Sequence, residues 1–307
     1  MGLDSDVKIT IPEGDSVNSI SKILSANNLI RNRYIFILYV SALGAEKNLQ
    51  AGNYIIPRSS NMNDIVYVLS KGLSEHEEIQ VTIQEGLNVW EIDKKLSDLG
   101  LISEGEFSSK FFNQEGYFFP DTYRLHQQEN GRINMDELKG KMADNFKDKT
   151  KELFKNLNLE KQKEIIITAS ILEKEAKTEE DMKLVSGIIN KRLSLGMLLE
   201  VDASVVYGAC LRNFKFLIFN FKKVENCDVT FQSPAAEIKI DSPYNTYIRK
   251  GLPAGPISNP GLVAIQAALN PQTSDYLYYL STRDGSQLIY AKTSAEHVKN
   301  RRKYLGL

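Results

Sequence analysis

The chain has 307 residues, of which 42% are hydrophobic and 25% are charged, and its formal net charge is −1. This length is enough for two domains that each bury a core, and the composition is that of an ordinary globular protein. Because the charges nearly balance, no global field would recruit nucleic acid or anionic lipid, and nucleic acid is not expected as a partner.

Residues 7–78 predict a small α+β module. Alternating apolar side chains indicate strands at 7–11 and 52–57, and helical spacing indicates helices at 16–27, 33–43 and 63–70. The order of a strand, a helix pair and a returning strand resembles LysM-like glycan-binding modules. Sugar binding follows only from that resemblance, and a small domain without a ligand is the alternative.

No apolar run in the sequence reaches the ~18 to 20 residues that cross a membrane. The most apolar N-terminal segment, residues 34–40, is too short, and the first four residues lack the basic and apolar regions of a signal peptide. The sequence alone therefore predicts either a cytoplasmic protein or one whose membrane anchor is not part of these residues.

Residues 79–113 predict a strand and a helix that connect the first module to the rest of the chain. Segment 79–92 repeats the alternation, the Glu-Gly turn and the following helix of segment 7–20, which indicates a duplicated unit. The next stretch, EGYFFPDTY at 115–123, places four aromatic side chains around a Pro-Asp corner. Such a stretch suits a groove that holds sugar rings, and it equally suits a core strand that ends in a turn.

Two helices at the centre of the chain carry the main chemical signal. A charged amphipathic helix is predicted at 135–157, then a buried helix that ends near residue 176, then a helix that begins after Thr178 and ends at Gly196. Glu173 and Glu175 stand at the polar end of the buried helix. On a helix they point about 200° apart, so they cannot share a face.

The side chains one turn back distinguish these two carboxylates. Glu175 leans over apolar side chains, whereas Glu173 leans over small ones and has Lys177 four residues on. We therefore predict that Glu173 is solvated and paired. Glu175 is predicted to be partly desolvated, with a pKa raised toward the range of a general acid. A solvated helix end without chemistry is the alternative.

Residues 209–240 are irregular and alternate Phe and Lys, which predicts an insertion with its own short strands. The basic and aromatic residues at 214–216 also resemble single-strand nucleic-acid sites, but without a basic excess a half-buried strand is favoured. Cys210 and Cys227 lack a CxxC motif and have few histidines nearby, so a zinc site is not expected. A disulfide and two free thiols both stay open.

The C-terminal part combines a rigid loop with further short elements. The dense Gly and Pro residues of segment 251–261 fix one backbone path, as expected for a loop that meets a ligand. A helix at 262–269, a hairpin at 276–290 and a closing helix at 295–304 follow. Helices and strands are mixed without a repeated βαβ rhythm, so the predicted class is α+β.

Six motifs occur in a single order along the chain: EGYFFPDTY at 115–123, ASILEKEA at 169–176, INKRL at 189–193, VDASVVYG at 201–208, YNTY at 244–247, and GLPAGPI with NPG at 251–261. Together they resemble the MltG-type (YceG-like) endolytic murein transglycosylases, from about residue 7 to the C-terminus. The resemblance implies a LysM-like module at 7–78 and a YceG-like catalytic domain at 79–307. It also implies a place on the extracytoplasmic face of the bacterial inner membrane, through an anchor absent from these residues.

The resemblance further implies the reaction. The β-1,4 bond between N-acetylmuramic acid and N-acetylglucosamine is cleaved inside a glycan strand, without water, to leave a 1,6-anhydro end. Glu175 matches the essential glutamate of the family and would act as acid and then as base, with neither metal nor cofactor. Substrate contacts are expected from these residues: Tyr244, Asn245, Thr246, Tyr247, Asp121 and Asp202. The expected partners are peptidoglycan strands and, through them, peptidoglycan synthases.

Two alternatives stay open at this level. A glycoside hydrolase would need a second carboxylate, for which Asp121, Asp202 and Asp241 are the candidates. A non-catalytic scaffold would instead bind the cell wall and recruit synthesis or division proteins. The segment at 209–240 is longer and more aromatic than is expected for the family. It is therefore expected to change the shape of the groove or of a partner surface.

Overall fold

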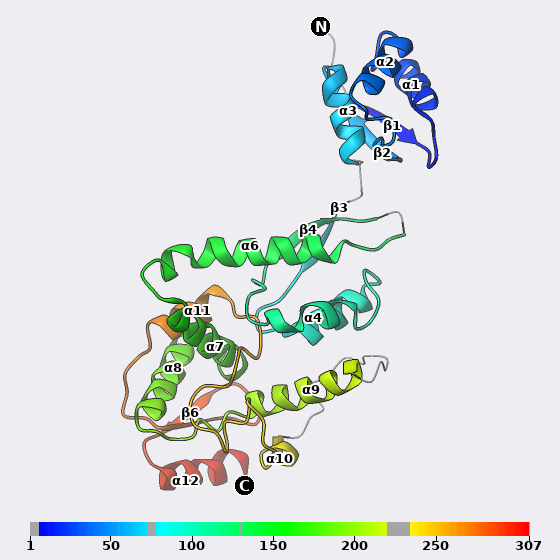
Figure 1. Cartoon of the computed structure of the whole chain (residues 1–307). Helices are drawn as coiled ribbons and strands as arrows, with labels where there is room; N and C mark the ends of the chain where they lie inside the picture. The colour runs from blue at the N-terminus through cyan, green and yellow to red at the C-terminus, as the bar shows by residue number, and fades with distance from the viewer. Residues whose placement is uncertain (1–5, 73–77, 129, 220–233, 307) are drawn as a thin grey trace. The chain divides into compact units, whose positions relative to one another are not determined.

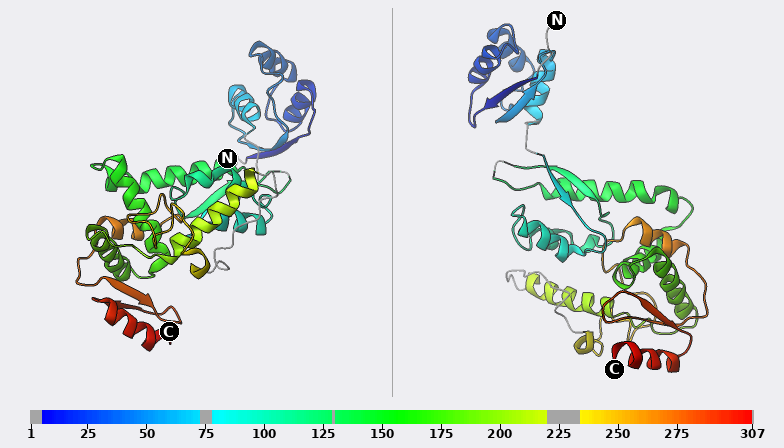
Figure 2. Two further views of the ribbon diagram at one scale, coloured as in Figure 1. Left: turned by 60° about the horizontal axis from the view of Figure 1, so that its bottom comes forward. Right: turned by 180° about the vertical axis from the view of Figure 1, so that it is seen from behind.

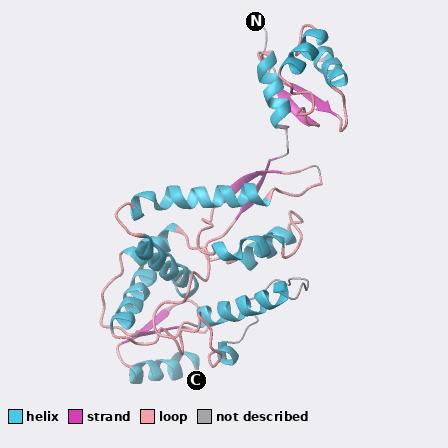
Figure 3. Ribbon diagram, viewed as in Figure 1, coloured by secondary structure: helices cyan, strands magenta, loops and turns pink. Residues whose placement is uncertain are grey.

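The computed structural model describes residues 6–72, 78–128, 130–219 and 234–306 (Figure 1). The chain divides into two compact units, Met1–Glu78 and Ile79–Leu307. Helices and short strands are mixed in both units, as the colouring of Figure 3 shows, and the predicted α+β class is confirmed. Among the described helices, none has the length and apolar character needed to cross a membrane.

The first unit combines a two-stranded antiparallel sheet with three helices. The strands pair with Val7 opposite Ile56 and Ile11 opposite Gly52, and the inward residues of β1 are buried in alternation. Asparagine or serine side chains cap the N-termini of all three helices. The elements are β1 (Val7–Ile11), α1 (Val17–Ala26), α2 (Arg33–Ala42), β2 (Gly52–Ile56) and α3 (Met62–Lys71).

The second unit is mainly helical, with two further strand pairs, β3 with β4 and β5 with β6. Helix α11 packs against α7 and α8, and helix α12 covers the β5–β6 pair (Figures 1 and 2). The elements are β3 (Glu78–Thr82), α4 (Val89–Asp98), α5 (Glu106–Phe111), the 3-10 turn η1 (Phe112–Gln114), β4 (Thr122–His126), α6 (Met135–Phe154), α7 (Leu159–Glu175), α8 (Glu179–Ser194), α9 (Asp202–Phe219), α10 (Pro234–Glu237), α11 (Leu262–Leu269), β5 (Tyr278–Ser281), β6 (Leu288–Ala291) and α12 (Ser294–Leu305).

Helix α7 is the buried helix that the sequence predicted. Every side chain from 165 to 172 is buried, and Glu175 is the last helical residue because Ala176 is extended, with φ −140° and ψ 150°. Thr178 then caps α8 by accepting a hydrogen bond from the Asp181 amide at 3.1 Å. Gly196, with φ +64°, follows the end of α8. The chain therefore turns sharply just after Glu175.

The aromatic stretch at 115–123 contributes to the core rather than to a groove. Phe118, Phe119 and Tyr123 are each at most 6% exposed, and Tyr117, although partly exposed, packs edge-on against Phe146 at 5.2 Å. The core alternative therefore holds for this stretch. Its buried rings belong to the main hydrophobic core cluster of the second unit, where burial of apolar surface stabilises the fold.

The prediction of short strands in 209–240 is wrong where the structure describes that segment. Helix α9 runs on through Phe219, and Cys210 and Phe214, four residues apart, both point into the core. The Phe214 ring packs against Trp90 at 5.6 Å and Phe112 at 5.3 Å. The alternation of Phe and Lys is typical of a strand, and for this reason the helical spacing of Cys210 and Phe214 was not recognised. Cys227 lies outside the described residues, so the alternative of a disulfide or two free thiols is not tested.

Candidate active site

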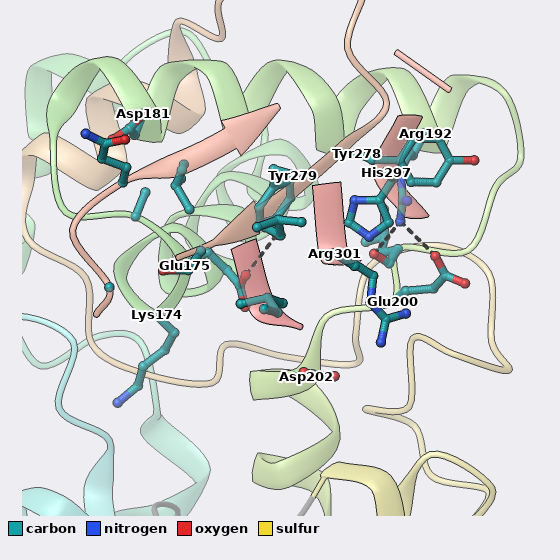
Figure 4. A pocket seen from close by; sticks show the side chains of 18 of the residues that line it. Lys174, Glu175, Asp181, Arg192, Glu200, Asp202, Tyr278, Tyr279, His297 and Arg301 are labelled. Carbon is teal, nitrogen blue, oxygen red and sulfur yellow. Dashed lines mark hydrogen bonds and ion pairs between the residues drawn. The ribbon is translucent and has the colours of Figure 1, made fainter. Parts of the chain in front are cut away.

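A pocket of about 1000 Å³ opens beside the C-terminal end of α7 (Figure 4). Most of its wall is built by the turn between α7 and α8, the segment before α9 with its first residue, the β5–β6 hairpin, and α12. Arg192 of α8 and Tyr247 of the YNTY segment complete it. The polar side chains of this wall are Glu173, Lys174, Glu175, Lys177, Thr178, Asp181, Arg192, Glu200, Asp202, Tyr247, Tyr278, Tyr279, Ser281, Ser286, Gln287, Ser294, His297 and Arg301.

Glu175 lies in this wall and has one hydrogen-bond donor among the described residues. The Tyr279 hydroxyl donates to Glu175 Oε2 at 3.0 Å, and Figure 4 shows the two side chains pointing toward each other. Burial is the largest effect on the pKa of Glu175. Together with the nearby charge of Asp202 it raises that pKa to about 7, against the opposing hydrogen bond from Tyr279. The carboxyl is therefore protonated in a large fraction of molecules near neutral pH, as a general acid requires.

Asp202 forms a second pair of a tyrosine and a carboxylate in the same pocket. It is the first residue of α9, and its Oδ1 accepts a hydrogen bond from the Tyr247 hydroxyl at 2.6 Å. Burial and this hydrogen bond raise the pKa of Tyr247, which keeps the phenol protonated and donating. Glu175, Asp202 and Tyr247 are thus three predicted site residues that the fold brings to one pocket.

The prediction for Glu173 is wrong. Its Oε1 accepts a hydrogen bond from the Gly261 amide at 2.8 Å, and Lys177 donates to the Gly285 carbonyl instead of pairing with it. Burial raises the pKa of Glu173 to about 7, with Glu85 adding to the shift. The loop before α11 covers part of this face of α7, so Glu173 is partly buried, although it still lines the pocket. Local spacing on the helix could not foresee that.

Three residues of the YNTY motif lie outside the pocket wall and support it from behind. Asn245 is 1% exposed, and its Nδ2 donates to the carbonyls of Ile238 at 3.0 Å and Ile240 at 2.8 Å. The Thr246 hydroxyl accepts from the Val201 amide at 2.9 Å, next to the start of α9. The Tyr244 ring packs on Tyr207 at 5.0 Å. These contacts hold the segments that carry Tyr247 and Asp202.

The remaining predicted carboxylates also lie away from the pocket. Asp121 accepts hydrogen bonds from the Thr122 amide at 2.7 Å and from Asn145 Nδ2 at 3.0 Å. Asp241 is paired with Arg249, whose Nε lies 2.7 Å from Oδ1. Of the three candidates for a second carboxylate, Asp202 therefore lines the pocket and the other two do not.

Sequence reasoning missed Arg192, Glu200 and Tyr279 as residues of the site. Arg192 is only 7% exposed, and it donates to the carbonyls of Leu277 at 2.7 Å and Leu199 at 2.8 Å. It thus ties α8 to the strand that carries Tyr279. The available signal was an arginine on the apolar face of the INKRL helix. No local pattern indicated Tyr279.

The profile of the YceG-like family matches residues 9–303. The chain belongs to the YceG-like family. Within the part of this YceG-like chain that the structure describes, no three His, Cys, Asp or Glu residues cluster as metal ligands would.

Two curated relatives and one solved structure are similar to this YceG-like chain over nearly its whole length. An endolytic murein transglycosylase of Bacillus subtilis (strain 168) is 28% identical, over 98% of this chain and 85% of its own length. One of Streptococcus pneumoniae (serotype 2, strain D39) is 27% identical, over 96% of this chain but only 57% of its own. A crystal structure of a putative yceG-like protein from Listeria monocytogenes is 26% identical, with a TM-score of 0.55 over 97% of this chain and 100% of that one.

Another buried carboxyl of the YceG-like chain, that of Glu115, lies outside the pocket. It is 5% exposed and accepts hydrogen bonds from the Val89 amide at 3.0 Å, the Tyr207 hydroxyl at 3.2 Å and Asn259 Nδ2 at 2.6 Å. It thereby joins α4, α9 and the loop before α11. Burial is the largest effect on its pKa and raises it to about 8.

Glu115 should make folding depend on pH. Because its pKa is higher in the folded chain, at about 8, than in the unfolded chain, the folded state binds more protons in between. Its contribution to stability is therefore lost as pH rises from about 4.5 to 8. The unfolding free energy of the wild-type chain should fall between pH 5 and 8, and in Glu115→Gln this fall should be smaller by about 3 kcal/mol. Urea denaturation at both pH values measures this, and an equal fall in both proteins would contradict it.

Proposed function

We propose that this chain is an endolytic lytic transglycosylase that cleaves the β-1,4 bond between N-acetylmuramic acid and N-acetylglucosamine within peptidoglycan strands and leaves 1,6-anhydro ends. The names of the two curated relatives support the general activity. The observation that carries the proposal is Glu175: a carboxyl with a pKa of about 7 in the wall of a pocket of about 1000 Å³, the size of a small-ligand site.

The proposed reaction uses one carboxyl group twice. Protonated Glu175 gives its proton to the glycosidic oxygen as the bond from that oxygen to C1 of the muramoyl residue breaks. The resulting carboxylate then removes the proton of the muramoyl 6-hydroxyl, and O6 forms the new bond to C1. Proton and electron pairs balance, and Glu175 ends protonated. A pKa near the working pH suits both steps, since the group must lose and regain its proton in each turnover.

Asp202 faces the positive charge that develops at C1. Its carboxylate lies in the same wall, and Tyr247 holds it in position through the 2.6 Å hydrogen bond. A fixed negative group stabilises an oxocarbenium-like transition state electrostatically. The same placement favours the hydrolase alternative, in which Asp202 would activate a water molecule instead.

Product analysis separates these two reactions. Purified peptidoglycan is digested with the chain, and mass spectrometry reads the ends of the fragments. We expect anhydro-muramoyl ends on fragments of several disaccharides. If the wild-type protein forms reducing ends and the Asp202→Asn variant does not, the chain is a hydrolase and the proposed transglycosylase reaction is wrong. Binding of intact glycan with no new ends would instead favour the non-catalytic scaffold.

Under this proposal the chain works at the bacterial cell envelope, on the extracytoplasmic face of the inner membrane. The first unit serves as a LysM-like glycan-binding module that holds a strand while the second unit cuts it. Peptidoglycan synthases are the expected protein partners, because they make the strands that an endolytic enzyme cuts. A pull-down of peptidoglycan by residues 1–78 fused to a reporter domain tests the first point, with the reporter alone as control.

A further inference from the structure

Tyr279 contacts the proposed acid from a distant part of the chain. It lies on β5, opposite Tyr290 of β6, while Glu175 ends α7. Its neighbour Tyr278 is used differently, because that ring stacks on His297 at 5.3 Å and lies beneath Arg192 at 4.9 Å. Tyr279 is therefore the residue of this strand that turns toward the carboxyl (Figure 4).

The hydrogen bond distinguishes the two oxygens of the Glu175 carboxyl. Oε2 accepts from the Tyr279 hydroxyl at 3.0 Å, whereas Oε1 has no hydrogen-bond partner among the described residues. Burial and the neighbouring carboxylates raise the pKa of Tyr279 well above its ordinary value, so the phenol stays protonated and keeps donating. An oxygen that accepts from a phenol is the poorer place for the acidic proton. The proton is therefore better placed on Oε1.

Among the described residues, the charged and titratable groups that act on this pair lie in the same wall. Asp202 contributes from α9, Tyr247 from the YNTY segment and Arg192 from α8. Asp202 disfavours the charged form of Glu175, and the Tyr279 hydrogen bond favours it. Arg192 acts on Tyr279, while its guanidinium is engaged by backbone carbonyls and Glu200. The direct contact with Glu175 is left to Tyr279.

We propose that Tyr279 is a positioning residue that holds the Glu175 carboxyl by its Oε2 and thereby reserves Oε1 for the proton delivered to the glycosidic oxygen. This inference rests on the proposed function, because it assigns Glu175 the role of acid. It adds a second task for Tyr279 after proton transfer. The hydrogen bond to a newly formed carboxylate is charge-assisted and stronger than the one to the neutral acid, so it also stabilises the intermediate state.

The Tyr279→Phe variant tests the proposal through the pH dependence of kcat/KM. Activity of the wild-type chain should fall as pH rises through about 7, where free Glu175 loses its proton. Without the hydroxyl the carboxylate loses its donor, so this alkaline limb should move upward by about one pH unit. The plateau value of kcat should fall by about tenfold or more, because the carboxyl is no longer held.

The Tyr290→Phe variant is the matched control. Tyr290 is the partner of Tyr279 across the two strands, and its hydroxyl also donates to a carboxylate, that of Asp181 at 2.5 Å. The Tyr290→Phe change removes the same hydroxyl group from the same hairpin but leaves the contacts of Glu175 intact. The alkaline limb should therefore stay at the wild-type pH. An equal shift in both variants would assign the effect to the hairpin as a whole and overturn the proposal.

A second substitution nearly keeps the shape of the side chain and should shift the alkaline limb in the opposite direction. Site-specific 3-fluorotyrosine at position 279 is a more acidic phenol and a stronger donor, so the limb should move to lower pH. An unchanged limb in a folded Tyr279→Phe protein, or shifts of the same sign in both variants, would overturn the positioning role. Failure of the proposed function looks different: the wild-type chain would then leave no anhydro ends, or Glu175→Gln would keep its activity, whatever happens at Tyr279.

Discussion

The Glu175→Gln variant should cleave peptidoglycan about 10² to 10⁴ times more slowly than the wild-type chain, the range expected for loss of a general acid and base. The amide is nearly isosteric and can still accept the hydrogen bond from Tyr279, but it has no proton to give. Binding of glycan should therefore be kept, and stability should not fall, because a carboxyl whose ionisation is costly in this wall has been removed. Release of soluble fragments, thermal unfolding and sedimentation with peptidoglycan measure the three quantities.

Glu160→Gln is the matched control for this prediction. It makes the same change in the same helix, at an exposed residue of the first turn of α7. Its cleavage rate should equal that of the wild-type chain. If Glu175→Gln also kept more than about a tenth of the activity, the assignment of Glu175 as the acid would have to be given up.

The Gly187→Ala variant should lower the free energy of unfolding by about 2 to 3 kcal/mol, although alanine is the better helix former. Gly187 lies inside α8, and a Cβ there would come 1.9 Å from the backbone oxygen of Gln272. The Gln272 amide in turn donates to the Lys183 carbonyl of the same helix at 2.9 Å. Helix and loop thus touch backbone to backbone, and no side chain can move aside. Denaturant unfolding followed by circular dichroism measures the loss.

Gly140→Ala in α6 is the control with the opposite sign. It is also a glycine inside a helix, but a Cβ there would meet nothing within 4 Å. Its replacement should stabilise the chain by up to about 1 kcal/mol, through helix propensity alone. If the Gly187→Ala protein were as stable as the Gly140→Ala protein, the backbone at Gln272 would have moved without cost, and the prediction would be wrong. Since this loop leads into β5, the Gly187 variant should also lose activity through Tyr279.

The candidate site was predicted in part, and the residues show where local reasoning stopped. Glu175, Asp202 and Tyr247 were named from the sequence and share one pocket. Tyr244, Asn245 and Thr246 belong to the same YNTY motif as Tyr247, yet they lie behind the wall. A sequence motif does not show which of its side chains faces the pocket. Asp121 is held away from the pocket by the neighbouring Thr122 amide and by Asn145 of α6.

Sequence by itself determined many of the secondary-structure elements of this protein, although not the helical continuation of α9. Buried helix α7, the Thr178 cap, the end at Gly196 and the final hairpin and helix all follow from periodicity and capping, which act within a few residues. Only the tertiary structure decided what meets the two carboxylates of α7. Gly261 reaches Glu173 across 88 positions and Tyr279 reaches Glu175 across 104. Burial and hydrogen bonding over such separations set both pKa values, and no local pattern encodes them.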